Sequence, residues 1–401
     1  MKIIKDPVHG YVEVSGDALA LLDSPLIQRL RYVRQLGFSH LVYPGANHTR
    51  FEHSMGTMHL AQIFCRLLGL DAEQERLIAA AGLLHDIGHG PYSHATEQLM
   101  AEFCGHRHHE VEELIRANAV AGTLEGLGLD PGDVCAVIEG NHPLAGIIHG
   151  DLDVDRMDYL MRDAHYTGVP YGTVDAHRLM RSTSLTDHGL VVTESGINAA
   201  ESLLIARTLM RPAVYFHHVS RIAERMIQFA AYEHLSRIGP EECGRMMRLD
   251  DAAFFSELLG SPSDTAREVT CMIYARRLYK RALYVGKDLV HVPSLMNLTG
   301  IAEGRTIAAE IADRAGIEAW QVLVDIPSFP SPMSMGVQVK NRHELVDLDE
   351  ISPLVNTLNE TRKQQWRMGI YTLPEHRHRV EEEATDVLHI KKPTKQDRLL
   401  V

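Results

Sequence analysis

The stretch Leu83-Leu84-His85-Asp86-Ile87-Gly88-His89-Gly90-Pro91 decides how this chain folds, because it places a His-Asp pair at the end of an apolar helix. Apolar residues recur upstream at steps of three and four, which puts His85 on the buried face: Leu77, Ile78, Ala81 and Leu84. Gly and Pro residues then end the helix. A buried His followed by Asp is costly unless both groups find partners or a cation. In isolation such a pair is more often a hydrogen-bonded core His, so the pair alone does not define a metal site.

The composition limits the class of protein. The chain has 401 residues, 45% of them hydrophobic, which is enough for one large helical domain or for two or three domains. Its formal charge of −13 argues against a general binder of nucleic acid or anionic membranes. The five cysteines are widely spaced, odd in number and without a CxxC pair, which is typical of reduced thiols in a cytoplasm: Cys65, Cys104, Cys135, Cys243 and Cys271. The first residues lack a signal-peptide core and no apolar run reaches membrane-spanning length, so we expect a cytoplasmic protein with no membrane partner.

The apolar periodicity predicts a mainly α protein with short β segments. Helices are expected at 17–22, from Pro25 to Gly37, through the stretches before residues 67 and 85, and over 197–234 with a kink at Pro212. Strands are expected as a pair within residues 2–14, and at 189–193, 320–327 and 336–340. The composition shifts near Gly239-Pro240, which predicts a helical core over 1–239 and a smaller α+β lobe over 240–401, with a charged tail after Glu381.

Four candidate metal ligands lie on three predicted helices: His53, His85, Asp86 and Asp155. Histidine is unusually frequent, at 24 residues, and many of these fall between His40 and His109. Two imidazoles and two carboxylates bind a divalent ion while leaving positions for water and substrate, unlike a closed structural site. This pattern predicts a catalytic metal centre.

Groups suited to proton transfer and phosphate binding lie near these ligands in the sequence. His89, His94 and His109 can change protonation near neutral pH, and Glu97 can orient an imidazole. Arginines can hold a polyphosphate in an otherwise acidic protein: Arg50, Arg156 and Arg207. Asp155, Tyr159 and Asp163 share one helical face, for which a solvated acidic face is an equal alternative. For the basic helical face of Arg29, Arg31 and Arg34 we expect exposure to solvent.

Taken together, these blocks resemble the HD phosphohydrolase superfamily, whose ligand pattern is H…HD…D, and within it the deoxynucleoside-triphosphate triphosphohydrolase branch. The resemblance covers about the first 240 residues and rests on five blocks in order: Asp6-Pro7-Val8-His9-Gly10, Gln28-Arg29-Leu30-Arg31-Tyr32, Arg50-Phe51-Glu52-His53-Ser54, His85 to His94, and Asp153-Val154-Asp155-Arg156-Met157-Asp158-Tyr159. It implies a helical HD-domain core with short β hairpins.

The resemblance also implies roles for individual residues. The metal ligands are the four named above, binding one divalent ion such as Mn, Fe, Zn, Ni or Mg, with Mg bound to the nucleotide as a further option. His89 and His109 would act beside the α-phosphate with support from His94, and Glu97 falls where the family has Asp. The register among His106, His108 and His109 allows more than one alignment, of which we choose His109. Family positions around the sugar, base and phosphates fall on Gln35, Leu36, Arg50, Arg156, Tyr159, Asp163, Arg207 and Tyr215.

Members of this branch that carry a SAM domain also have an activating nucleotide site between subunits. Asp23, Gln28 and Arg31 match part of it, which implies a homo-oligomer, a dimer or a tetramer, although exposure of these residues to solvent is an equal alternative. The implied activity is metal-dependent hydrolysis of dNTPs to deoxynucleoside and tripolyphosphate. The alternatives are an HD-type nucleotidase or phosphodiesterase acting on another nucleotide, and a nucleotide-binding sensor.

Overall fold

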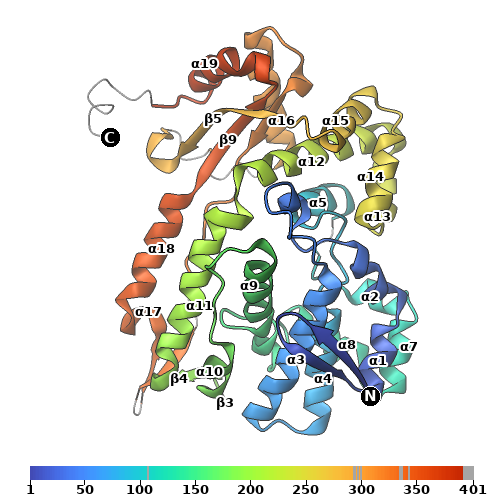
Figure 1. Cartoon of the computed structure of the whole chain (residues 1–401), viewed down its shortest axis with the longest axis vertical. Coiled ribbons are helices and arrows are strands. Elements are labelled where there is room, and N and C mark those ends of the chain that lie inside the picture. The colour runs from blue at the N-terminus through green and yellow to red at the C-terminus, as the bar shows by residue number, and fades with distance from the viewer. Residues whose placement is uncertain are drawn as a thin grey trace.

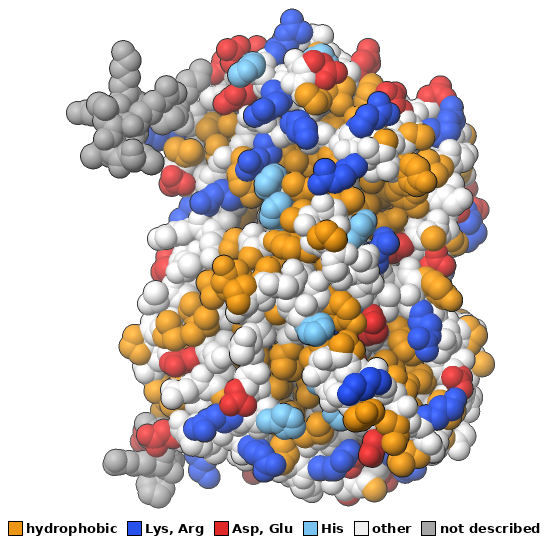
Figure 2. Space-filling model, in the orientation of Figure 1, with side chains coloured by type: hydrophobic (Ala, Val, Ile, Leu, Met, Phe, Trp, Pro, Cys, Tyr) orange, Lys and Arg blue, Asp and Glu red, His pale blue; other side chains and the backbone are white. Residues whose placement is uncertain are grey.

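The computed structural model describes residues 1–105, 108–291, 295, 298, 300–333, 337–341 and 344–391. It is mainly helical, with short strands in three small sheets among these residues, which confirms the predicted fold class (Figure 1). On the face shown in Figure 2, Lys and Arg side chains lie among acidic and apolar ones. Within the described residues, no helix is both long enough and apolar enough to cross a membrane.

The chain begins with the predicted strand pair. Strands β1 (Lys2–Asp6) and β2 (Gly10–Val14) pair antiparallel, with Lys2 opposite Val14 and Asp6 opposite Gly10. The Asp6 carboxylate accepts the backbone N–H groups of Val8 and His9, both at 2.8 Å, and Gly10 takes a left-handed φ of 80°. Val12 and Val14 are fully buried, so one face of the hairpin packs on the helical core.

The helix predicted from Pro25 to Gly37 is shorter than expected. Helix α1 (Gly16–Leu22) is followed by α2 (Pro25–Arg29) and the 3₁₀ turns Leu30–Tyr32 and Gly37–Leu41. Between these turns the chain is extended, because the N–H of Gln35 bonds to the carbonyl of His48 at 3.0 Å and the N–H of Arg50 to that of Val33 at 3.0 Å. Apolar periodicity does not reveal this pairing between two loops, so the predicted helix length is wrong.

The central helices are α3 (Arg50–Leu68), α4 (Ala72–Leu84) and α9 (Val154–Thr167), and α3 packs against both of the others. Each begins at a side-chain cap: Thr49 with Glu52, Asp71 with Gln74, and Asp153. Helix α8 (Pro131–Ile138) packs on the far side of α4. Between α4 and α8 the chain forms α5 (His94–Leu99), the π turn Met100–Cys104, α6 (Glu112–Arg116) and α7 (Val120–Gly126).

The predicted long helix is broken at the expected place. Helix α11 (Ile197–Met210) passes through a π turn at Arg211–Tyr215 into α12 (His218–Ile238), because Pro212 offers no N–H to the helical ladder. Before it, α10 (Ala176–Arg181) leads into the hairpin of β3 (Thr183–Thr186) and β4 (Gly189–Thr193). After it, α13 (Cys243–Met246), α14 (Asp251–Leu259) and α15 (Asp264–Tyr274) follow, with α14 and α15 packed on α12.

The last third combines an antiparallel sheet with two covering helices. Strands β5 (Lys280–Gly286), β9 (Arg367–Thr372) and β6 (Val322–Asp325) form the sheet in that order, against α16 (Ile301–Ala315) and α19 (Arg377–Val387). Strand β6 confirms the strand expected at 320–327. Half of the tail expected after Glu381, residues 392–401, lies outside the described residues, and α19 continues past Glu381 to Val387.

Residues 337–341 and 344–365 return to the first part of the chain. Strand β7 (Gln338–Asn341), expected within 336–340, pairs parallel with β4 and antiparallel with β8 (Glu344–Asp347). Helix α17 (Leu348–Ile351) then leads into α18 (Pro353–Gln365), which packs along α11. The division into 1–239 and 240–401 stays a prediction, and the two segments interleave at this sheet.

Candidate metal centre and catalytic pocket

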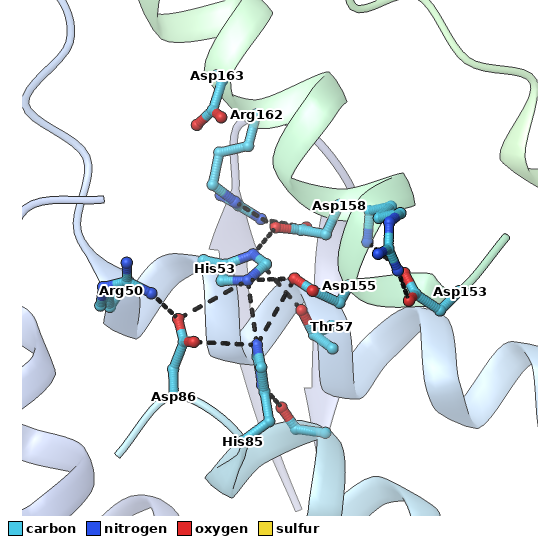
Figure 3. Close-up of polar contacts among 12 residues, drawn as sticks. Arg50, His53, Thr57, His85, Asp86, Asp153, Asp155, Asp158, Arg162 and Asp163 are labelled. Carbon is cyan, nitrogen blue, oxygen red and sulfur yellow. Dashed lines mark hydrogen bonds and ion pairs between the residues drawn. The ribbon is translucent and has the colours of Figure 1, made fainter. Parts of the chain in front are cut away.

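Three helices bring the four expected ligands to one point (Figure 3). His53 lies in the first turn of α3, His85 and Asp86 follow α4, and Asp155 lies in the first turn of α9. His53 Nε2 is 2.9 Å from Asp155 Oδ1, 3.2 Å from His85 Nε2 and 3.8 Å from Asp86 Oδ2. The candidate donor atoms of His53, His85 and Asp86 all lie within 4.8 Å of one another.

The hydrogen bonds of the two imidazoles fit a bound cation. His85 Nδ1 lies 2.8 Å from the Gly82 carbonyl oxygen, which can only accept, so Nδ1 carries the proton. His53 Nδ1 lies 2.7 Å from Asp158 Oδ2 and donates in the same way. The two Nε2 atoms therefore direct lone pairs toward the same point, beside two carboxylates. Opposed lone pairs and anions require positive charge between them, so a divalent ion fits this donor set.

The same electrostatics act on the protons of the ligands. Burial disfavours the charged imidazole of His53, but its hydrogen bonds to Asp155 and Asp158 outweigh burial and raise its pKa to about 10. Burial also opposes ionisation of Asp86, whose pKa the adjacent Arg50, His85 and His89 nevertheless hold well below its usual value. The pKa values of His53 and Asp86 are thus shifted by neighbours of opposite charge, and a divalent ion held by these ligands would replace the extra proton of His53.

Arg50 and His89 lie beside Asp86. Arg50 Nη1 donates to Asp86 Oδ2 at 2.6 Å, and its Nε donates to Ser93 Oγ at 2.7 Å. His89 Nε2 is 3.3 Å from Asp86 Oδ1. Burial, together with the positive charges of Arg50 and His108, lowers the pKa of His89 well below its usual value. His89 is therefore a neutral imidazole at the edge of the metal site, with one ring nitrogen that carries no proton.

Glu97 lies between the predicted catalytic residue His94 and a further histidine, His108. Its carboxylate is 3.1 Å from His94 Nδ1 and also bonds to His108 Nδ1. Burial opposes ionisation, but these hydrogen bonds outweigh it and lower the pKa of Glu97 below its usual value. The His108 ring stacks on that of His89, with centroids 4.1 Å apart.

The structure thus places His108, which was not chosen from the sequence, in contact with Glu97. His109 lines the same cavity as the metal ligands, beside His108, and His106 lies outside the described residues.

The remaining residues expected to bind substrate divide into those that line this cavity and Arg207, which does not. The cavity has a volume of about 510 Å³, and the metal ligands form part of its lining. Seven of the expected residues also line it: Gln35, Leu36, Arg50, Arg156, Tyr159, Asp163 and Tyr215. Asp163 accepts hydrogen bonds from Tyr215 Oη and from His48 Nε2, both at 2.8 Å. Arg207 is not among the lining residues, and it faces Asp151 at 3.5 Å.

Two residues that the sequence analysis did not assign to the site hold the loop after α4 that carries His89 and Tyr92. Arg29 donates to the carbonyl oxygen of His89 at 2.8 Å and to those of Met247 and Leu249 at 3.0 and 2.9 Å, so the expectation that it faces solvent is wrong. Asp251 accepts the N–H of Tyr92 at 2.7 Å, where the chain takes a left-handed turn. These four bonds join positions far apart in sequence, which local patterns do not reveal.

The expected regulatory residues lie at the surface near α2. Gln28 donates to the carbonyl of Leu22 at 2.8 Å and accepts from Arg31 Nε at 2.8 Å. Arg31 also covers the Phe51 ring at 3.5 Å, and Asp23 is exposed at the end of α1. Their role in binding a second nucleotide stays a prediction.

A helical fold with an open set of two imidazoles and two carboxylates beside a neutral histidine is the architecture of a metal-dependent hydrolase. The chain belongs to the HD-domain family: residues 50–163 match the HD domain, and residues 174–399 match the HD associated region.

The chain is also similar in sequence and structure to individual proteins. An uncharacterized protein of Methanocaldococcus jannaschii is 34% identical over 378 residues, covering 92% of this chain and 79% of that protein. The deoxynucleoside triphosphate triphosphohydrolase SAMHD1 homolog of Dictyostelium discoideum is 32% identical over 257 residues, covering 58% of this chain and 49% of its own length. The match thus spans about half of that protein. The crystal structure of a hypothetical protein from Aquifex aeolicus superposes with a TM-score of 0.75 at 30% identity, covering 95% of this chain and 99% of that one.

Proposed function

We propose that the protein hydrolyses deoxynucleoside triphosphates to the deoxynucleoside and inorganic tripolyphosphate. The observation that carries this proposal is one cavity of about 510 Å³ lined both by the metal ligands with His89 and His108 and by the group Asp163, Tyr159 and Tyr215. The first set suits phosphoester hydrolysis, and the second suits a sugar. The similarity to a deoxynucleoside triphosphate triphosphohydrolase supports the same substrate class.

The sugar end of the cavity supports a deoxyribose. Asp163 receives two hydrogen bonds at 2.8 Å, from Tyr215 and His48, and its carboxylate retains lone pairs to accept a sugar hydroxyl. Tyr159 and Tyr215 stand edge to face beside it, with ring centroids 6.1 Å apart. In our proposal these two rings fill the space that a 2′-hydroxyl needs, so ribonucleotides are rejected by steric exclusion.

The chain's own side chains divide the chemistry between them. A bound divalent metal would polarise a phosphoryl oxygen and offset developing negative charge. Arg50 and Arg156, which line the cavity, hold phosphate oxygens. Arg207 lies outside the lining and faces Asp151, and in our proposal it turns from Asp151 toward the end of the polyphosphate. His89 accepts the proton of the attacking water, whose oxygen bonds to the α-phosphorus. As the bond from phosphorus to the 5′-oxygen breaks, His108, oriented by Glu97, gives its proton to that oxygen.

The decisive experiment incubates the purified protein with each dNTP and each NTP, with and without a divalent metal, and identifies the phosphate product. Tripolyphosphate from dNTPs, formed only with metal, is the expected result. Orthophosphate or pyrophosphate alone contradicts the proposal and indicates another HD-type nucleotidase. Turnover of cyclic or oligomeric nucleotides alone indicates a phosphodiesterase, and binding without any product indicates a sensor.

We further infer a homo-oligomer in the cytoplasm, with a second nucleotide site near Asp23, Gln28 and Arg31. The exposure of Asp23 and Arg31 leaves both side chains accessible to a second nucleotide or subunit, and the inference itself rests on the match of the three residues to the family's regulatory site. Light scattering with and without added dNTP is the test. A mass that corresponds to a monomer under both conditions contradicts this inference.

A further inference from the structure

A chain of buried charged groups runs from the turn of the N-terminal hairpin to the metal ligand His53. The hairpin, residues 2–14, precedes both segments that match the HD-domain family, 50–163 and 174–399. Its turn nevertheless reaches the centre of the molecule, because Asp6 is only 2% exposed and bonds to Arg162, which is fully buried.

Asp158 is the member of this chain that contacts His53. Its Oδ2 accepts from His53 Nδ1 at 2.7 Å and from Arg162 Nε at 2.9 Å, and its Oδ1 accepts from Arg162 Nη2 at 2.9 Å and from His9 Nε2 at 2.5 Å. In Figure 3, Asp158 lies on one side of His53 and the other three metal ligands lie on the opposite side. Every oxygen lone pair of this buried carboxylate is therefore matched by a donor.

These contacts fix which nitrogen of His53 can bind a metal. A carboxylate that accepts from Nδ1 holds the proton there and directs the Nε2 lone pair toward Asp86 and Asp155. If Asp158 rotates, the imidazole loses both its tautomer and its orientation. The position of Asp158 is in turn set by the donors that surround it, Arg162 and His9.

The hairpin supplies two of the groups that hold Asp158 in place. Asp6 Oδ2 accepts from Arg162 Nη1 at 2.8 Å, while its Oδ1 holds the turn through the N–H groups of Val8 and His9. His9 itself reaches Asp158. Opposite them, Gly56 leaves the room for the pair, because a Cβ at that position would overlap both Asp158 and Arg162.

Folding alone does not require this arrangement. Val12 and Val14 already anchor the hairpin by apolar burial, and apolar residues replace buried ion networks with equal or better stability in many proteins. We propose that the hairpin is part of the metal centre, with Asp6 and His9 as positioning residues that hold Asp158 and, through it, His53 in the ligating orientation. This inference rests on the metal ligands of the proposed function and not on its nucleotide substrate.

The test is a titration of the metal-free full-length protein with Co²⁺, followed by the visible absorption of the bound ion. His9→Leu removes the donor to Asp158, whereas His9→Gln retains a side-chain N–H. Loss of a supporting partner of a metal ligand typically weakens binding by about 10–100-fold. We expect a weakening in that range and an altered Co²⁺ spectrum for His9→Leu, and affinity within about threefold of wild type for His9→Gln.

Asp6→Asn gives a second, independent measurement, and Glu13→Gln is its matched control, because Glu13 is exposed on the same hairpin. Asp6→Asn should weaken Co²⁺ binding and Glu13→Gln should not. A folded His9→Leu protein, verified by circular dichroism, with wild-type affinity and spectrum overturns the proposal. Failure of the wild-type protein to bind Co²⁺ overturns it together with the ligand assignment, whereas absence of dNTP turnover affects only the proposed function.

Discussion

Gly88 controls how closely the loop carrying His108 approaches the metal site. A Cβ at Gly88 would overlap the backbone carbonyl of His108, so Gly88→Ala must displace this loop and with it the contacts of His108 to Glu97 and His89. A displacement of about 1 Å in a catalytic group can cost about 100-fold in rate. We expect Gly88→Ala to lose at least that much turnover of dNTPs while the bound metal, measured by elemental analysis, stays at the wild-type level.

Gly122 offers the matched control for this substitution. It lies in helix α7 with no atom within 4 Å of an added Cβ. Gly122→Ala should therefore retain full turnover and gain up to about 1 kcal/mol of stability from the better helix former. Equal activity of the two variants would exclude a catalytic role for the position of the His108 loop.

A ligand and a proton acceptor respond differently to removal. Asp155→Ala removes one of four donors, so we expect loss of both bound metal and turnover. His89→Ala leaves all four donors and removes the neutral imidazole beside them, so metal content should stay while turnover falls by about 10²- to 10⁴-fold. A metal-loaded, active Asp155→Ala protein would refute the ligand assignment.

For individual residues, the sequence predicts a place in the site best where the residue lies on or next to a regular helix. His53, His85, Asp86 and Asp155 could be predicted as one site because periodicity places His53 and His85 on buried helical faces and the four residues match the ligand pattern H…HD…D. His108 could not be distinguished from His109, because no period governs the loop that carries them. Arg29 and Asp251 were missed as parts of the site, since their bonds to the His89 and Tyr92 backbone join distant segments.

At the scale of elements, Asp325 joins strand β6 to helix α12. Asp325 is 2% exposed and accepts from Arg221 at 2.5 and 3.1 Å, from Arg225 at 2.9 Å and from Tyr371 at 3.0 Å. Burial opposes its ionisation, but Arg221 and Arg225 outweigh burial and lower its pKa below the usual value. Asp325→Asn leaves two guanidinium groups, each 14% exposed, without this anion, and we expect a loss of about 3–5 kcal/mol in the free energy of unfolding.

The pH dependence of this contribution follows from the direction of the shift. A lowered pKa in the folded state means that the stabilisation is fully present above the unfolded pKa, about 4, and is lost as pH falls through the folded pKa. Urea unfolding of wild type and Asp325→Asn should therefore give a gap that is widest near about pH 7 and narrows toward about pH 3. Asp264→Asn is the control, since that side chain is 91% exposed. A gap that widens on acidification would contradict the assignment.

Most elements could be predicted from local pattern, and the exceptions share a cause. The hairpin of residues 2–14, the end of α4 and the break at Pro212 all follow from local chemistry. The helix expected from Pro25 to Gly37 ends at Arg29, because residues 33–35 bond instead to residues 48–50. A segment that pairs with another loop does not display the period of either helix or strand.

At the scale of the whole molecule, the two predicted segments share their hydrophobic cores. The core around α3, α4 and α11 includes Val339, Val355 and Leu358 from the last third of the chain. The core around α12 includes Phe38 and Tyr92 from the first third, together with Leu323 and Tyr371. Strand β7 completes the sheet of β3 and β4 across about 150 residues of sequence, a contact that composition near Gly239 does not reveal.

Shared cores make unfolding of one segment without the other unfavourable, so we expect a single cooperative transition. The chain carries its own probes for this: both tryptophans, Trp320 and Trp366, lie after residue 240, whereas the long helices α3, α4, α9, α11 and α12 precede it. Thermal unfolding followed by tryptophan fluorescence should have the same midpoint as unfolding followed by far-ultraviolet circular dichroism. Midpoints separated by several degrees would instead support two independently folding lobes with a boundary near residue 239. Coincident midpoints would mean that the two segments unfold as one cooperative unit, as their shared cores require.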